Sequence, residues 1–532
     1  STPRPGPEPV KSRLLPALAA LLLAPACRGA GPGAPAPAFR VEEATIAGAH
    51  REMRAGRLTA RRLVEEYLAR IEAYDRRGPA LNALVTLSPD ALRTADSLDA
   101  VLARGGAMGP LHGIPVIVKD NYDTRGLPTT AGSLALAGTV PADDAFQVRR
   151  LREAGAIVLA KSNMAEWAFT PYETVGSAHP GHTRNPYALD RTTAGSSGGT
   201  AAAVAASLGM VGLGTDTGNS IRGPSAHTAL VGIRSTMGLT SRDGIVPLYL
   251  DRDVGGPMAR TVADAVAVLD VIAGPDPADP VTAGSRARMP RSYADHLRPD
   301  GLRGKRIGVA RQLSDAPGAD PEVLRRFEEA LRDLRAGGAV VVDSVRVPEL
   351  DTIRGSLWCP RFRTDVEAYL ATRAPGTVPR TVDEVLRSGR YHPSVEGRLR
   401  SFAAFQGVER DESCRQAAVN APRLAAGVRK VLADGRLDAL VYPTWSHPPR
   451  RIGDLNTPHG NNRWQLSPPT GFPALTVPMG YARGVLPVGL QVLGDAWSEP
   501  ALIEIAYAYE QATRHRRPPR FLPSADSTVP AR

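Results

Sequence analysis

The sequence predicts an α/β protein in which one mixed β-sheet forms the core between layers of α-helices. Short apolar runs rich in β-branched residues alternate along the chain with amphipathic segments of helical period. With 532 residues and 42% hydrophobic content, the chain can bury one large core. The aromatic share is 5%, so this core must consist mainly of small and aliphatic side chains.

The expected elements follow one another without an internal repeat. An amphipathic helix begins near Thr59, because apolar residues recur at helical spacing from Leu63 to Ile71. The strands expected after it are 116–118, 157–159, 211–213, 306–310, 339–342, 437–442, 474–478 and 488–493. The helices expected among them are 145–154, 200–207, 322–336 and 499–513. We expect the helices between Arg361 and Leu432 to form a cap over the sheet.

Residues 1–27 have the composition of a signal peptide. Arg4 and Lys11 precede the apolar stretch Leu14 to Ala26, which is too short to span a bilayer. The small residues before Cys27 resemble the lipobox of bacterial lipoproteins, so lipidation of Cys27 would attach the protein to a membrane. Cleavage after an A-x-A site without lipidation is the alternative. Either interpretation predicts export, to the periplasm or cell envelope or as a secreted protein.

The rest of the chain divides into three parts. A linker rich in Gly, Pro and Ala spans 28–40, one folded domain spans 41–522, and 523–532 is expected to be a disordered tail. Within the domain only Cys359 and Cys414 remain, and neither has the spacing of a metal ligand. The sequence leaves open whether these two cysteines form a disulfide.

The charge pattern argues against a nucleic-acid partner. The formal net charge is +11, but the arginines are interspersed with acidic residues along the helical segments instead of forming one block. This distribution is typical of a solvated surface of mixed charge.

Lysine is rare in this chain, which makes each lysine informative. Only five are present, and Lys119 ends the apolar run HGIPVIVKDN. A lysine amine can lose its proton, whereas a guanidinium cannot, so Lys119 is a candidate base. Lys161 also follows an apolar run, and we expect it to be structural.

Two turns rich in glycine and serine follow, GSSGG at 195–199 and GTDTGNSIR at 214–222. The first satisfies G-x-S-x-G with Ser197 at its centre, as in the nucleophile elbow of α/β-hydrolases. That elbow should follow a strand, yet the preceding NPYALDRTT contains no apolar run, and no acidic motif selects a partner histidine. A P-loop is disfavoured because no Gly-Lys-Ser/Thr follows the glycines.

Taken together, these motifs resemble the amidase signature family. The family pattern of a lysine after GIPVxVKDN, then GSSGG, then GTDxGxSIR is present, and the resemblance continues from about residue 41 to 520. It implies a single amidase-signature domain over 41–522 with no metal or cofactor. It also implies a Ser-Ser-Lys triad, in which Ser220 is the nucleophile, Ser196 the bridging serine after a cis peptide bond, and Lys119 the base.

These implied roles are chemically consistent. A serine hydroxyl becomes a nucleophile only when a neighbouring group takes its proton, and a neutral amine can do so through a second hydroxyl. Lys119 must therefore be neutral near pH 7, which burial on a strand end can achieve.

The second turn is expected to bind the developing oxyanion through backbone N–H groups of Thr217, Gly218, Asn219 and the nucleophile itself. Asn219 stands where glycine is commonest in the family. We expect it to adopt a left-handed backbone and to narrow the pocket or contact the substrate. Three residues are assigned supporting roles: Asp216 and Arg222 as an ion pair that holds the loop, and Ser197 as a hydrogen-bonding residue beside the turn.

The sequence thus predicts an amidase that releases ammonia or an amine from a small-molecule carboxamide or peptide amide through an acyl-enzyme. The stretch GLTSRDGIVPL from Gly238 resembles the peptide-amidase branch, which favours C-terminal or aryl carboxamides. Two alternatives remain open: a glutamyl-tRNA amidotransferase A-like subunit, and a surface binding lipoprotein without turnover. Monomer and homodimer are both open.

Overall fold

The computed structural model describes residues 2–4, 6, 39–374, 376–460 and 466–528. Cys27 and most of the predicted signal segment and linker lie outside these residues. The chain divides into two units, 1–39 and 40–532, and the second contains every helix and strand discussed below.

The core of the second unit is a mixed sheet of eleven strands in the order β1-β3-β2-β6-β8-β7-β12-β13-β11-β9-β10. β2 pairs in parallel with β3 and β6, whereas β8 is antiparallel to both β6 and β7. This confirms the predicted mixed α/β architecture. The strands are β1 (Leu84–Leu87), β2 (Pro115–Lys119), β3 (Ile157–Ser162), β6 (Val211–Asp216), β7 (Val231–Arg234), β8 (Val254–Ala259), β9 (Arg306–Ala310), β10 (Val340–Val345), β11 (Ala439–Pro443), β12 (Ala474–Ala482) and β13 (Leu486–Leu493).

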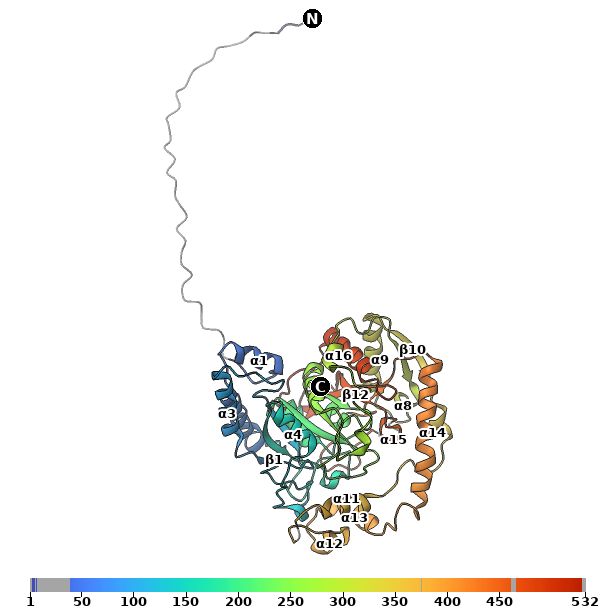
Figure 1. Ribbon diagram of the computed structural model, residues 1–532. Helices are drawn as coiled ribbons and strands as arrows, with labels where there is room; N and C mark the ends of the chain where they lie inside the picture. Colours follow the sequence, from blue (N-terminus) through green and yellow to red (C-terminus); the bar gives the residue numbers. More distant parts are fainter. Residues whose placement is uncertain (1, 5, 7–38, 375, 461–465, 529–532) are drawn as a thin grey trace. The chain divides into compact units, whose positions relative to one another are not determined.

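Helices surround this sheet (Figure 1). They are α1 (Ile46–Arg54), α2 (Ala60–Ile71), α3 (Ala91–Ala103), α4 (Phe146–Glu153), α5 (Gly198–Ala205), α6 (Arg222–His227), α7 (Val262–Ile272), α8 (Arg311–Ser314), α9 (Pro321–Ala336), α10 (Pro348–Thr352), α11 (Phe362–Ala371), α12 (Val382–Ser388), α13 (Glu396–Ala403), α14 (Glu412–Asp434), α15 (Ser467–Thr470) and α16 (Glu499–Thr513). The Thr59 hydroxyl caps α2 by accepting a hydrogen bond of 3.1 Å from the Arg62 N–H, which explains where that helix begins. None of the described helices combines the length and apolarity needed to cross a membrane.

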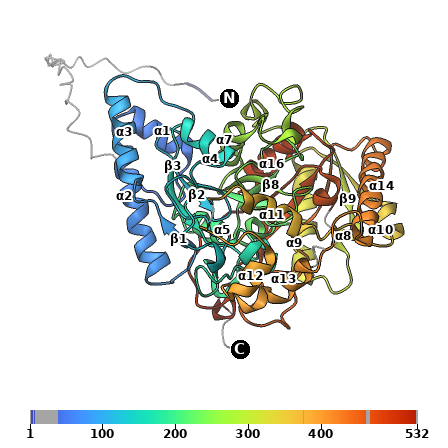
Figure 2. The same ribbon diagram turned by 60° about the horizontal axis from the view of Figure 1, so that its bottom comes forward.

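The helices expected as a cap separate into two groups. Helices α11, α12 and α13 lie together in both views and pack on the loop after β3, where Phe169 contacts Phe362 and Phe402 at ring distances of 4.8 and 5.3 Å (Figures 1 and 2). Helix α14 instead shares an apolar cluster with β11 and with Phe472, next to β12. A disulfide between Cys359 and Cys414 joins the segment before α11 to the first turn of α14. The two cysteines that the sequence left unassigned are therefore paired.

Two expectations require correction. The segment before GSSGG does form a strand, β5 (Ala188–Thr192), which pairs with β4 (Arg184–Asn185) in a separate two-stranded sheet. The sequence of this strand contains no apolar run. Its Asp190 is only half-buried and accepts a hydrogen bond of 2.8 Å from the Ser524 hydroxyl. The tail expected to be disordered also contains structure as far as Thr528, since Ala525 is buried in an apolar cluster with Ala188.

Candidate active site

Lys119 is the last residue of β2, and its amine is enclosed by protein. The side chain is 0% exposed, and Nζ donates hydrogen bonds of 2.7 Å to Ser196 Oγ and of 2.7 Å to Thr215 Oγ1. Burial lowers the pKa of Lys119 from its ordinary value to about 7, although the negative charges of Asp216 and Asp253 act in the opposite direction. Near pH 7, about half of these amines are therefore neutral and able to accept a proton.

Ser196 lies between β5 and α5 and follows a cis peptide bond from Gly195. A Cβ atom at position 195 would collide with the carbonyl oxygens of Thr170 and Glu173, so the turn requires glycine there. The Ser196 carbonyl accepts a hydrogen bond of 3.1 Å from the Ala165 N–H. These backbone contacts hold the Ser196 hydroxyl against Lys119.

Ser220 lies in the turn between β6 and α6 and is 5% exposed. Because β2 and β6 are parallel, with Val118 opposite Leu213, their carboxyl ends meet at one edge of the sheet. This register brings the turn with Ser220 to the same edge as Lys119. Within the described residues, no acceptor is paired with the backbone N–H groups of Gly218 and Ser220. A Cβ atom at Gly218 would meet nothing within 4 Å, so this side of the turn is open.

A buried ion-pair network holds the turn in place. Asp216 Oδ2 lies 3.1 Å from Arg222 Nε, and Asp216 Oδ1 lies 3.3 Å from Arg234 Nη1. Burial alone would raise the pKa of Asp216, but the charges of the two arginines outweigh it and the pKa is lowered. Arg222 also donates a hydrogen bond of 3.0 Å to the Gly218 carbonyl. The expected ion pair between Asp216 and Arg222 is thus present and holds the turn directly.

Asn219 differs from the expectation. It is absent from the residues with positive φ, so the turn does not need a left-handed residue there. Its side chain is 0% exposed and its amide atoms have no hydrogen-bond partner among the described residues. A Cβ atom at Gly223 would lie 2.8 Å from both Asn219 Nδ2 and Trp445 Nε1. The Asn219 side chain is therefore packed inside the protein and offers no accessible polar group to a substrate in this structure.

Comparison with known proteins identifies the family. The model of the family described as Amidase matches residues 62–503. The chain belongs to the amidase signature family. A probable amidase of Arabidopsis thaliana is 34% identical over 505 residues, covering 91% of this chain and 93% of that protein. The A-type subunit of a glutamyl-tRNA(Gln) amidotransferase from Acinetobacter baumannii is also 34% identical, covering 86% of this chain and 93% of its own length.

Solved structures agree with this assignment. The native peptide amidase from Stenotrophomonas maltophilia is 42% identical, with a TM-score of 0.80 over 90% of this chain and 99% of its own. A bacterial aryl acylamidase of the amidase signature family has a TM-score of 0.72 at 23% identity, a likeness of fold alone. This amidase family member is therefore an enzyme that acts on amides.

Ser197, the serine at the centre of G-x-S-x-G, has a structural environment in this amidase. Its buried Oγ donates to the Thr215 carbonyl at 3.3 Å and accepts from the Thr215 N–H at 3.3 Å. The hydroxyl thus links the start of α5 to β6. Although β5 precedes the turn, the hydrogen bonding of Ser197 does not resemble that of an activated nucleophile.

The second buried lysine is held in an ion pair. Lys161 Nζ lies 3.2 Å from Asp120 Oδ1 and donates to the Tyr122 carbonyl and to Thr129 Oγ1, each at 2.8 Å. These contacts tie the loop after β2 to β3, as expected of a structural lysine.

Three residues of the amidase site were not singled out from the sequence. Thr215 accepts from Lys119, and Asn121 Nδ2 donates to the same Thr215 oxygen at 3.1 Å. Asp253 accepts a hydrogen bond of 2.5 Å from Thr217 Oγ1, and burial raises its pKa to about 6. Thr215 and Asn121 fall inside the quoted motifs, which could have indicated them. Asp253 lies outside these motifs, and no pattern in the sequence alone indicates its role.

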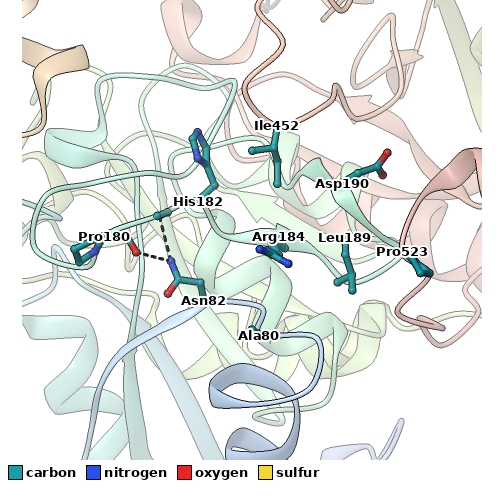
Figure 3. A pocket seen from close by; sticks show the side chains of 10 residues that line it. Ala80, Asn82, Pro180, His182, Arg184, Leu189, Asp190, Ile452 and Pro523 are labelled. Atoms are coloured by element: carbon teal, nitrogen blue, oxygen red, sulfur yellow. Dashed lines mark hydrogen bonds between the residues drawn. The ribbon is translucent and has the colours of Figure 1, made fainter.

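A surface pocket of about 710 Å³ lies elsewhere (Figure 3). Figure 3 shows Asn82, His182, Arg184 and Asp190 around it, with Asn82 donating to the Pro180 carbonyl at 3.1 Å. None of the residues assigned to the active site lines this pocket.

Proposed function

We propose that this chain hydrolyses carboxamides through a Ser220, Ser196 and Lys119 relay. The observation that carries the proposal is the 2.7 Å hydrogen bond from a buried lysine, with its pKa lowered to about 7, to a serine hydroxyl at the sheet edge shared with Ser220. A structural lysine would be paired with a carboxylate, as Lys161 is with Asp120. Lys119 has two hydroxyl partners instead.

The first half of the reaction forms an ester. Ser220 Oγ attacks the carbonyl carbon while its proton passes to Ser196, whose own proton passes to the neutral Lys119 amine. The backbone N–H groups of Gly218 and Ser220, without acceptors among the described residues, stabilise the oxyanion. When the tetrahedral intermediate collapses, the carbon–nitrogen bond breaks. Lys119 then returns its proton through Ser196 to the leaving nitrogen, and ammonia or an amine departs.

The second half hydrolyses the ester. Water attacks the acyl carbon and gives its proton to Lys119 by the same relay. Ser220 recovers a proton as the carbon–oxygen bond breaks, and the carboxylic acid is released. The net reaction consumes one water and leaves the enzyme unchanged.

For the substrate, we propose C-terminal carboxamides of peptides, with aryl carboxamides as related substrates. The 42% identity to a peptide amidase over 90% of the chain supports this class. A component of a glutamyl-tRNA amidotransferase is the second candidate, because the A-type subunit of such an enzyme is 34% identical over 86% of the chain. If the purified chain hydrolyses a peptide amide without any other protein, this result would favour the carboxamide hydrolase over the amidotransferase component. A surface binding lipoprotein without turnover is disfavoured by the assembled Lys119 and Ser196 pair.

We propose further that the protein is exported, with Cys27 lipidated. The paired Cys359 and Cys414 support this location, because disulfides persist mainly in oxidising compartments. Fractionation of cells expressing the wild-type chain and Cys27→Ser tests both points. A wild-type protein found in the cytosol would contradict export, and equal membrane retention of both proteins would contradict lipidation.

Two measurements on one preparation test the catalytic proposal. A fluorophosphonate probe is expected to label wild-type protein once, on Ser220 as located by peptide mapping, and not to label Ser220→Ala. Ammonia release from a peptide amide should be lost in the same variant. Labelling of Ser197 instead, or full turnover by Ser220→Ala, would contradict the assignment.

A further inference from the structure

A second cavity, of about 510 Å³, lies between α14, α15 and the sheet. About half of its exposed wall is apolar, and small residues of α14 and the disulfide cysteines close one side. None of the residues assigned to the triad or to the oxyanion turn lines it. The lining includes Met237, Tyr249, Pro468, Phe472 and Trp497.

The cavity nevertheless lies at the catalytic edge of the sheet. Strands β6 and β7 are both antiparallel to β8, so their carboxyl ends share an edge with the start of β8. Thr236 follows β7, Arg252 precedes β8, and both line the cavity. The residue after Arg252 is Asp253, which accepts the hydrogen bond from Thr217 of the oxyanion turn. A ligand that contacts Arg252 would therefore be one residue along the chain from Asp253, which is hydrogen-bonded to the turn that holds the nucleophile.

Arg252 is the feature that gives the cavity a chemical preference. The residue is 9% exposed, and among the described residues Nη2 has no hydrogen-bond partner. Its two acidic neighbours are engaged elsewhere: Asp251 pairs with Arg361 at 3.0 Å, and Asp253 binds the turn. The guanidinium packs instead on the rings of Tyr249 and Trp358, at 5.4 and 5.7 Å from their centres. Burial lowers the pKa of Arg252 to about 10, so it still carries its charge at pH 7.

A second arginine in the same wall provides the contrast. Arg429 also lines the cavity, but it lies 3.0 Å from Asp495 and its side chain is 54% exposed. Its charge is already neutralised and hydrated. Asp251 also lines the cavity and its charge acts on Arg252, but among the described residues no carboxylate forms a salt bridge with Arg252.

We propose that this cavity binds a small carboxylate that bears an aromatic or branched apolar group. A buried charge without a partner is costly, and a guanidinium matches a carboxylate with two parallel hydrogen bonds. The apolar wall formed by Met237, Phe472 and Trp497 would bury the remainder of such a ligand. Inorganic anions lack the apolar part, and neutral apolar compounds leave Arg252 unpaired.

Two sources could supply such a ligand: the acid released by the proposed hydrolysis, or a free acid made by another reaction. The binding proposal does not depend on turnover, because it can be measured in Ser220→Ala, which the proposed function predicts to be inactive. Failure of binding and failure of catalysis are therefore separate results.

The test is isothermal titration of 3-phenylpropionate into Ser220→Ala, compared with 3-phenylpropanol and with inorganic phosphate. We expect saturable binding of the carboxylate, and at least about tenfold weaker binding of the alcohol and of phosphate. Introducing Arg252→Gln into the Ser220→Ala protein should weaken carboxylate binding about tenfold or more. The matched control Arg429→Gln should change it less than about threefold. Circular dichroism checks that each variant is folded.

The outcomes separate cleanly. If the acid binds no more tightly than the alcohol or than phosphate, the proposal is overturned, and this result requires no substitution in the cavity. Binding that survives Arg252→Gln, or that disappears when Ser220 of the wild type is blocked by fluorophosphonate, would place the acid in the catalytic site and also overturn it. If the acid product of a hydrolysed peptide amide binds through Arg252, the reaction is the source. If only 3-phenylpropionate does, the source is another reaction.

Discussion

The Lys119 amine and the Ser196 hydroxyl are joined by a 2.7 Å hydrogen bond inside a site from which the lysine side chain has no access to solvent. The amine finds a second hydroxyl, that of Thr215, also at 2.7 Å. Hydroxyl partners can accept from the amine without fixing its charge, unlike a carboxylate. This environment is what allows a lysine to act as a base near neutral pH.

Activity should rise with pH through the pKa of Lys119. The amine must be neutral to accept the Ser220 proton, and burial places its pKa at about 7. We therefore expect kcat/KM for a peptide amide to increase about tenfold per pH unit below pH 7 and to level off above it. A flat profile between pH 5 and 7 would contradict the role of Lys119.

The control for this profile is Asp253→Asn. The negative charge of Asp253 favours the protonated form of Lys119, so removing it should lower the pKa of Lys119 and move the midpoint of the profile to lower pH. The variant also removes the carboxylate whose own pKa is raised to about 6. A shift toward higher pH would show that the charge of Asp253 acts in another way.

Ser197→Ala should affect stability more than chemistry. The substitution leaves the Thr215 N–H and carbonyl without the hydrogen bonds that they form with Ser197 Oγ, which costs about 1 to 3 kcal/mol of unfolding free energy. Because Ser197 is outside the proposed relay, kcat should fall less than about tenfold. Urea denaturation and steady-state kinetics measure the two effects, and loss of turnover in a fully stable variant would mark Ser197 as catalytic.

Asp216→Asn should destabilise the protein strongly. The carboxylate pairs with Arg222 and Arg234 in a wholly buried site, and both guanidiniums would lose their negatively charged partner. Breaking a buried pair in this way costs about 3 to 5 kcal/mol. The exposed pair between Lys430 and Asp434, at 2.7 Å, provides a matched control, since Asp434→Asn should cost less than about 1 kcal/mol. Equal effects of the two substitutions would contradict the structural role of Asp216.

Loss of the disulfide should lower stability without removing the active site. Cys359 and Cys414 are 55 residues apart in sequence, and closing a loop of that size contributes about 4 kcal/mol by chain entropy. We expect a lower Tm for the double Cys→Ser variant, and the same shift on adding reductant to the wild type. A Tm insensitive to reductant would indicate that the pair is not formed in the purified protein.

The elements with strong periodicity were predictable from the sequence. Helix α16 occupies the expected residues Glu499–Thr513, and β2 extends the expected strand by one residue at each end, so that Lys119 is its last residue. In both elements the spacing of apolar residues follows from burial in the sheet or against it, so the sequence pattern indicates the element directly. The motifs likewise brought Lys119 and Ser196 into one hypothesis.

The remaining features depend on tertiary contacts that no local pattern encodes. Strand β5 has no apolar run because it belongs to a small separate sheet. The sequence predicts a left-handed backbone at Asn219, but the turn enters α6 without one. Asp253 reaches Thr217 from a loop 36 residues away. The tail near Ala525 is ordered by an apolar cluster that includes Ala188, hundreds of residues earlier.

The central claim is that Lys119 transfers a proton through Ser196, and kcat/KM of Lys119→Arg beside Lys119→Ala tests it most directly. Arginine keeps the positive charge but cannot release its proton at neutral pH. We predict that both variants lose activity to the same extent, by about a thousandfold or more, while fluorophosphonate labelling of Ser220 slows in parallel. Near-normal turnover by Lys119→Arg would contradict the claim, because a fixed charge would then be sufficient.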